Sequence, residues 1–168
     1  MAALNLRRLS ARVARARSAV HKGVKYGLGK GGNLPNAATP ADGGLCDCSG
    51  FALAWVFYLA RRPKNGRPGW LETTAVARDA TGAQKTWVAI ERPIAGCAVV
   101  YGDHGGEQGH CAVVTDATFD AKGRVATLHG VDCSSGRSRA TGEAINERDL
   151  SFFIAKNPVY AVLKEDLA

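Results

Sequence analysis

The sequence predicts an α+β domain in which N-terminal helices pack on a central antiparallel β-sheet. Its 168 residues are about one domain's worth, with one candidate core and no internal repeat. Helical patterns occupy the first part of the chain, whereas short β-branched runs separated by turns follow residue 93. A composition of 46% hydrophobic and 22% charged residues is typical of a packed domain and excludes a disordered or collagen-like chain.

The N-terminal segment is basic and has the pattern of an amphipathic helix. Residues 1–41 contain eight lysines and arginines and no acidic residue, while the rest of the chain is close to neutral. One face of a helix over about residues 4–21 would carry the apolar side chains Leu6, Leu9, Val13 and Val20. We therefore expect a basic amphipathic helix over 1–21 and a single domain over 22–168.

This basic helix predicts an anionic partner, and an anionic envelope polymer is favoured because the chain offers no recognisable nucleic-acid motif. The alternatives are that the helix packs on the following domain or only aids solubility. Arginines recur through Arg17 and leave no apolar core for a secretory signal peptide. The longest apolar run, residues 51–60, is too short to span a bilayer, so we expect no membrane span.

A loop followed by a buried helix is expected next. Residues 27–46 are rich in glycine, proline, asparagine and aspartate, which is typical of loop. The chain is then apolar on nearly every side of a helix over 51–60, with Asp47 as the predicted N-cap. The arginines at 61–62 would lie at the negative end of this helix, and Pro63 would terminate it.

The remaining chain is expected to form the sheet. Residues 63–92 are polar and broken, and we interpret them as loop with a short helix. Short runs rich in β-branched residues predict four strands, at 97–101, 110–117, 124–131 and 159–163. A turn at residues 120–123 would close a hairpin between the second and third, with Gly123 able to adopt positive φ.

Cys48 is the candidate nucleophile among five cysteines, an odd number that cannot be fully paired within one chain. It would lie in the first turn of the buried helix, where unpaired N–H groups and the positive end of the helix dipole favour the thiolate. Ser49 and Gly50 keep its surroundings small, so that a substrate could approach the sulfur. The alternative is a small buried side chain with only a packing role.

His110 is the candidate general base, because it follows a glycine-rich loop and begins an apolar strand. The third group of the site, which would orient the imidazole, is Asp132 or His129 on the paired strand. If the hairpin closes around residues 121 and 122, Asp132 lies opposite Ala112 and shares the parity of His110. His129 would lie opposite Thr115, out of phase, so the hairpin geometry favours Asp132.

The order of these elements resembles that of the NlpC-type cell-wall cysteine peptidases, which have a papain-like fold. KYGLGKGG (25–32) is similar to the family's Tyr-x-Trp-Gly-Gly element, and LCDCSGF (45–51) to its nucleophile motif. ERPIAGCAVVY (91–101) is similar to its Pro-x-x-Gly-Asp strand, and QGHCAVV (108–114) to its histidine strand. The resemblance covers about residues 22–135.

The resemblance implies Cys48 as nucleophile, His110 as general base and Tyr26 as a neighbour of the oxyanion site. It also favours Asp132 over His129, because the segment GVDCSSG is similar to a Val-x-His-Cys-Ser stretch that phage-type relatives carry. The sequence departs from the family pattern at three positions, which affect the substrate pocket more than the mechanism: Leu28, Cys97 and Cys111.

The expected function is peptidoglycan hydrolysis by a cysteine endopeptidase that cuts stem peptides between D-glutamate and diaminopimelate. Thiolate attack would give a thioester, with the oxyanion held by the Cys48 backbone N–H and the Tyr26 hydroxyl. A CHAP-like N-acetylmuramoyl-L-alanine amidase is the near alternative, and neither reaction needs a cofactor or a metal. We expect a protein made in the cytoplasm that acts on the cell wall as a phage-associated, lytic or secretion-delivered enzyme.

Two alternatives lie outside this class of function. Papain-like domains also act on proteins or acyl groups, and the fold does not fix the substrate. The chain could instead be a zinc-binding or redox-sensing module, since it contains the soft ligands Cys46, Cys48, His110, Cys111 and Cys133. One residue between Cys46 and Cys48, where zinc knuckles have two or more, argues against the zinc module.

Overall fold

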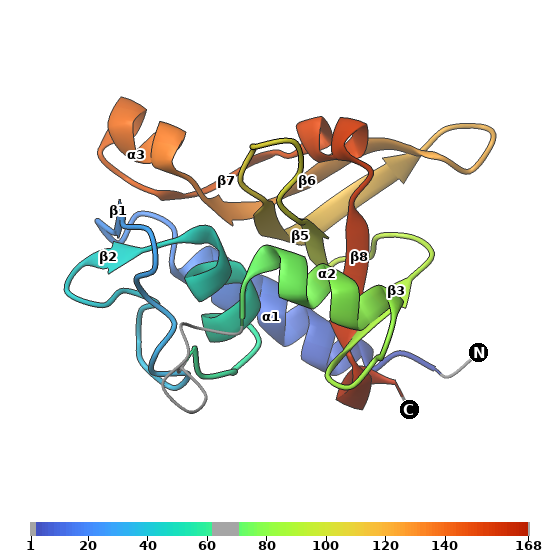
Figure 1. Cartoon of the computed structure of the whole chain (residues 1–168), viewed down its shortest axis with the longest axis horizontal. Coiled ribbons are helices and arrows are strands. Elements are labelled where there is room, and N and C mark those ends of the chain that lie inside the picture. The colour runs from blue at the N-terminus through green and yellow to red at the C-terminus, as the bar shows by residue number, and fades with distance from the viewer. Residues whose placement is uncertain (1–2, 62–70, 168) are drawn as a thin grey trace.

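A six-stranded antiparallel sheet with helices packed around it forms the body of the molecule, in a computed structural model that describes residues 3–61 and 71–167 (Figure 1). Its strands follow the spatial order β3-β8-β4-β5-β6-β7. In chain order they are β3 (Trp87–Ile90), β4 (Ala98–Tyr101), β5 (His110–Phe119), β6 (Val125–Cys133), β7 (Ile145–Asp149) and β8 (Val159–Leu163). The predicted α+β class and the antiparallel sheet are confirmed.

Helices and a small second sheet complete the fold. The helices are α1 (Leu6–Ser18), α2 (Thr73–Thr81) and α3 (Ser135–Thr141), with 3₁₀ turns at Ser151–Lys156 and Lys164–Asp166. A short π-type helix spans Gly50–Trp55, preceded by an α-helical turn at residues 48 and 49. Strands β1 (Lys25–Tyr26) and β2 (Leu45–Cys46) pair in parallel within the otherwise irregular segment before this helix.

All four predicted strands are present, but the sequence reading missed both edge strands. The segment over 63–92 contains α2, as expected of a short helix, and also the four-residue edge strand β3. At the other edge, β7 has the sequence INERD, whose polar residues hide the β signal. The charged residues of β7 are typical of an edge strand, which they protect from further pairing, whereas β3, with the apolar sequence WVAI, is only four residues long.

The helix that begins near Cys48 is shorter than expected. Its regular part ends at Trp55, and the chain then turns with Tyr58 in the left-handed region at φ +57°. Arg61 is not at the helix C-terminus, as the sequence suggested, but returns to the other end of the helix to pair with Asp47. The predicted roles of Arg62 and Pro63 fall outside the described residues.

The β5–β6 hairpin sets the register of the residues that matter below. Gly123 adopts φ +76° in its turn, as predicted. Asp132 lies opposite Ala112, which confirms the expected pairing. A register shift after Val114 leaves Thr115 without a partner, so His129 lies opposite Asp116 rather than Thr115.

The large sheet is buried on both faces by alternating side chains. On β4 and β5, one set packs with the helix after Cys48 and with α2, namely Ala98, Val100, Cys111 and Val113. The intervening residues pack on the opposite face against Leu150 and Phe153, namely Val99, Ala112 and Val114. The period of two along each strand therefore separates the core into two layers.

The basic helix α1 packs on the domain instead of standing apart from it. Leu9 and Ala16 are buried, while Leu6 is 69% exposed. Near the place where both chain ends lie (Figure 1), Leu4 forms a bridge with Leu167. Arginines of α1 pair with acids elsewhere in the domain, in the pairs Arg8–Glu165, Arg12–Asp166 and Arg17–Glu147.

These contacts favour the alternative that α1 is a packed part of the domain, and they reduce the positive charge it can offer to an anionic polymer. Arg15 stacks on Trp55 and Tyr58, at 3.9 and 3.8 Å from the ring centroids. Envelope binding by this helix stays a prediction. None of the helices in the described part of the chain combines the length and apolar character needed to cross a membrane.

Candidate active site

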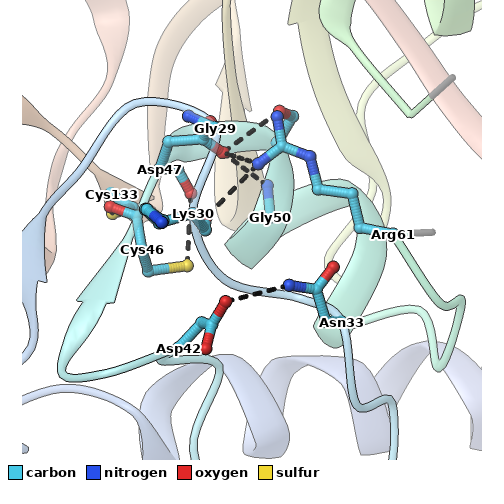
Figure 2. A network of polar contacts seen from close by, with 10 residues as sticks. Gly29, Lys30, Asn33, Asp42, Cys46, Asp47, Gly50, Arg61 and Cys133 are labelled. Atoms are coloured by element: carbon cyan, nitrogen blue, oxygen red, sulfur yellow. Dashed lines mark hydrogen bonds and ion pairs between the residues drawn. The ribbon is translucent and has the colours of Figure 1, made fainter. Parts of the chain in front are cut away.

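Cys48 lies in the first turn of its short helix. The side chain of Asp47 holds the backbone of this turn and that of the glycine-rich loop beside it. The Asp47 carboxylate accepts hydrogen bonds from the backbone N–H of Gly50 at 2.8 Å and of Gly29 at 2.7 Å. The predicted N-cap is therefore present, and it also ties the glycine-rich loop to the helix. Figure 2 shows Asp47 at the centre of this network.

Arg61 completes the network around Asp47. Its guanidinium lies 2.5 Å from Asp47 Oδ1 and also donates to the carbonyl of Lys30 at 3.3 Å (Figure 2). Asp47 is 1% exposed, so its charge needs this partner to offset the cost of burial. Ser49 also donates its hydroxyl to Asp47, at 3.2 Å, so that hydroxyl is engaged with the cap.

His110 is the first residue of β5, and Asp132 on β6 holds its ring. His110 Nε2 lies 2.9 Å from Asp132 Oδ2, which leaves Nδ1 as the ring nitrogen available to Cys48. Cys48 and His110 lie close enough for each to shift the pKa of the other. The structure thus brings together the predicted nucleophile, the predicted base and the favoured third residue.

Arg148 on β7 holds Asp132 from the other side. Its Nε and Nη2 lie 3.0 and 2.6 Å from the two Asp132 oxygens, a bidentate pair in which Asp132 is fully buried. The guanidinium also lies 5.1 Å from the ring centroid of Phe152. A chain of contacts therefore runs from Cys48 through His110 and Asp132 to Arg148.

Aromatic rings enclose the imidazole. The ring centroids of Phe153 and Phe152 lie 5.4 and 6.3 Å from that of His110, with interplanar angles of 25° and 27°. Tyr101, opposite His110 in the β4–β5 ladder, lies at 6.5 Å. Only 16% of the His110 side chain is exposed, and this apolar wall strengthens the interactions of its charge.

The close approach of neighbouring backbone explains the glycine before His110. A Cβ on Gly109 would lie 2.2 Å from Thr73 Oγ1 and 2.5 Å from the Tyr101 carbonyl oxygen. No side chain fits there unless β5 moves away from β4 or α2. Gly109 thus allows His110 to begin its strand at this position.

The electrostatics of the site favour a thiolate and an imidazolium. A hydrogen bond from the Cys111 thiol, together with the hydrogen bond and charge of His110, outweighs burial and lowers the pKa of Cys48 to about 5. Burial would lower the pKa of His110, but hydrogen bonds and charge from Asp132 and Cys48 outweigh it and raise that pKa to about 9. The two groups therefore stabilise each other as an ion pair near neutral pH.

Two shallow clefts lie on either side of the Cys48–His110 pair. One, of about 140 Å³, is lined by Cys48, Ser49 and Tyr26 among others. The other, of about 240 Å³, is lined by His110 and Arg148, and again by Tyr26. Tyr26, Gln108 and Gly109 line both clefts, so the two clefts meet at these residues.

The Tyr26 hydroxyl can donate a hydrogen bond over the whole range in which the site is charged. Burial, followed by the charge of Cys48, raises the pKa of Tyr26 above its usual value. The side chain therefore stays protonated beside the sulfur. This is the property required of the oxyanion donor that the sequence predicts.

His129 lies away from the site. It is exposed and lies opposite Asp116 and Asp149 in the strand ladders, whereas the ring of His110 contacts Asp132. Local sequence patterns do not reveal Arg61, Arg148 or the contact of Cys111 with Cys48. Arg148 belongs to a strand that composition hides, and Arg61 pairs with a residue 14 positions earlier, so neither gave a local signal.

The described residues include no group of three or more histidine, cysteine, aspartate or glutamate side chains placed to hold a metal ion. The geometry therefore gives no support to the zinc-module alternative. No known protein family, curated protein or solved structure matches this chain. Any function must accordingly be argued from the site itself.

Proposed function

We propose that this protein is a cysteine hydrolase of amide bonds, with Cys48 as nucleophile, His110 as acid and base, and Asp132 orienting His110. One observation carries the proposal. A cysteine at a helix start, with its pKa lowered to about 5 in part by a neighbouring histidine, lies beside that histidine, and a ring nitrogen of the histidine is held by a buried carboxylate. This arrangement is that of an activated thiol nucleophile.

In the first half of the reaction, the Cys48 thiolate adds to the amide carbonyl carbon and forms a tetrahedral oxyanion. The Cys48 backbone N–H and the Tyr26 hydroxyl donate hydrogen bonds to that oxygen. His110 then gives its proton to the amide nitrogen, the C–N bond breaks, and the amine leaves. The acyl group stays on sulfur as a thioester, and His110 is left neutral.

In the second half, neutral His110 takes a proton from water as the water oxygen adds to the thioester carbonyl. Collapse of this second oxyanion breaks the C–S bond, releases the carboxylic acid and restores the thiolate beside the imidazolium. Asp132 keeps Nε2 protonated throughout, so that Nδ1 is the nitrogen that exchanges protons. Arg148 keeps Asp132 ionised and fixed.

The proposed fold class is papain-like and of NlpC type, and the proposed substrate is the peptidoglycan stem peptide. The supporting facts are the DCSGF and GHCAVV segments, and the contact between the cysteine and histidine that they supply. The bond between D-glutamate and diaminopimelate is the proposed cleavage point. The same machinery could act at the muramoyl–alanine bond, and the fragments produced distinguish the two.

Digestion of purified peptidoglycan, with mass spectrometry of the soluble fragments, tests this function. Wild-type protein and Cys97→Ala, a control at a buried cysteine on the opposite face of the sheet, should release the same fragments. Cys48→Ala should release none above buffer while keeping its far-UV circular dichroism. Absence of products from the wild type, or equal release by Cys48→Ala, contradicts the proposal.

A further inference from the structure

Four of the five cysteines cluster around the candidate active site, in two thiol pairs. Cys48 and Cys111 are neighbours in one core layer and shift each other's pKa in opposite directions, and the Cys133 thiol donates to the Cys46 carbonyl. All of these residues are buried in the same core layer, and all are free thiols. The proposed hydrolysis uses only Cys48, so the other three thiols need an explanation of their own.

The two pairs differ in their access to solvent. Cys48 is 8% exposed and lines a cleft, whereas Cys111, Cys46 and Cys133 are fully buried. In Figure 2 the Cys46 thiol donates to the Asp47 carbonyl, and the Cys133 thiol donates to the Cys46 carbonyl at 3.3 Å. A small oxidant can therefore reach Cys48 from the cleft while the second pair stays protected.

We propose that Cys48 and Cys111 form a reversible disulfide when a hydroperoxide enters the cleft, which makes this pair a modification site that switches the protein off. The disulfide rests on the proximity of the two thiols and on the access that the cleft gives to Cys48. Its effect on catalysis rests on the proposed hydrolase function, because a sulfur held in a disulfide is no longer a nucleophile.

The first step oxidises Cys48. Its thiolate attacks the distal oxygen of the hydroperoxide, the O–O bond breaks, and Cys48 sulfenic acid forms while the leaving alkoxide or hydroxide takes a proton from the His110 imidazolium. Sulfur is oxidised by two electrons and the peroxide is reduced by two. Cys48 is the thiol suited to this step because reactivity with peroxide follows thiolate character and exposure.

The second step uses Cys111. Its sulfur attacks the Cys48 sulfur, an S–S bond forms, and the sulfenic hydroxyl leaves as water after accepting the Cys111 proton. Burial, and then the hydrogen bond and charge of Cys48, raise the pKa of Cys111 while Cys48 is a thiolate. A sulfenic acid is neutral, so the contribution from the Cys48 charge disappears when Cys111 is required to react.

Return to the active form needs a dithiol reductant, one thiolate of which attacks the cleft-facing Cys48 sulfur and releases Cys111 as a thiol. The second thiol of the reductant then attacks the mixed disulfide, which releases Cys48 and leaves the reductant as its own disulfide. Cys111 itself is too deeply buried for direct attack. Without a resolving partner, continued peroxide would carry Cys48 on to sulfinic and sulfonic acids, which dithiols do not reduce. Cys111 therefore protects the nucleophile as well as inactivating it.

Peptide mapping of the wild-type protein tests the disulfide without any mutation. Reduced protein is treated with hydrogen peroxide, its remaining thiols are alkylated, and the protein is digested under non-reducing conditions. The expected product is a linked pair of peptides containing Cys48 and Cys111, with the other three cysteines alkylated. The proposal is overturned if Cys48 is found mainly as sulfinic or sulfonic acid, or linked to any other cysteine.

Recovery of activity provides the second measurement, with each variant compared with its own activity before peroxide. Wild type and the matched control Cys97→Ala should regain at least about four-fifths of their hydrolysis after dithiothreitol, and Cys111→Ala less than about one-fifth. Equal recovery by Cys111→Ala overturns the proposal.

The hydrolase function and the Cys48–Cys111 disulfide can be contradicted independently of each other. A protein that forms the Cys48–Cys111 link but never releases peptidoglycan fragments supports the modification site and contradicts the hydrolase. A protein whose hydrolysis depends on Cys48 but that forms no such link supports the hydrolase and overturns the thiol site.

Discussion

The two halves of the candidate site are held in place by different means. The nucleophile half, residues 27–61, is mostly loop and short helix, and one carboxylate, that of Asp47, connects its parts. The base half consists of β5, β6 and β7, where ladder pairing fixes the backbone and Asp132 contacts the imidazole. Each half thus contains a buried aspartate paired with an arginine from later in the chain.

This difference separates a structural aspartate from one that acts on the chemistry. Asp47 contacts backbone N–H groups and Arg61, and makes no hydrogen bond to the reacting sulfur. Asp132 contacts a reacting group, and its own backbone is already fixed by the sheet. Loss of Asp47 should therefore appear mainly as lost stability, and loss of Asp132 mainly as lost turnover.

Asp132→Ala should have the largest effect on catalysis. Without the carboxylate, the His110 ring is neither oriented nor kept in the required tautomer, and we expect kcat/KM to fall about 10³-fold, or about 4 kcal/mol. His129→Ala, on the same strand but away from the site, is the matched control and should stay within about twofold. Steady-state kinetics on a soluble stem peptide measure both, and a larger loss for His129→Ala would contradict the assignment.

Asp47→Ala should lower the free energy of unfolding by about 3 kcal/mol, because it leaves Arg61 and two backbone N–H groups without their partner. Asp42→Ala is the control, since Asp42 is exposed and, within the described residues, its carboxylate pairs only with Asn33 in the same loop. Urea unfolding measures the change. If Asp47→Ala is as stable as wild type but loses turnover as severely as Asp132→Ala, the proposed division between the two halves is wrong.

Activity should follow a bell-shaped pH profile set by both halves together. Cys48, with its pKa lowered to about 5, loses the thiolate below that pH, and His110, with its pKa raised to about 9, loses its proton above that pH. Two pH units outside this window, kcat/KM should fall about 100-fold.

The pH profiles of the variants sharpen this test. Asp132→Ala removes a charge that raises the pKa of His110, so its alkaline limb should move to lower pH. Folded Asp47→Ala should leave that limb in place. An alkaline limb that does not respond to Asp132→Ala would show that His110 is not the group titrating there.

Features of this fold that have a local signal are predictable from the sequence. The β-branched runs predicted the four inner strands, and the hairpin arithmetic placed Asp132 opposite Ala112, on the side of His110. A bulge cannot be located from composition, so His129 was placed one residue off. The choice between Asp132 and His129 did not depend on that error.

The missed features all depend on tertiary contacts. Arg61 follows an apolar run and was assigned to a helix end, yet the chain turns back at Tyr58 and brings it to Asp47. Cys111 should face away from His110 on an extended strand, and it does so, into the core layer that contains Cys48. The short helix that carries Cys48 begins across the end of β5. This placement brings both His110 and Cys111 close to the Cys48 sulfur.

Arg148→Met should have the smallest of these effects. It tests how far catalysis depends on the ion pair between Arg148 and Asp132 in the base half. Arg148 does not touch the imidazole, so its loss acts through the freedom that Asp132 gains. We expect kcat to fall about tenfold with KM within about twofold, because an orientation effect is felt in the transition state.

Arg148→Lys keeps the charge but not the bidentate geometry, and should restore stability more than kcat. Arg139→Met, on the exposed side of α3, is the control for removing an arginine near the site. If Arg148→Lys restored kcat fully, charge alone would suffice. The bidentate contact would then only stabilise the sheet. Arg148 would offset the cost of burying Asp132, as Arg61 does for Asp47, and would have no part in the chemistry.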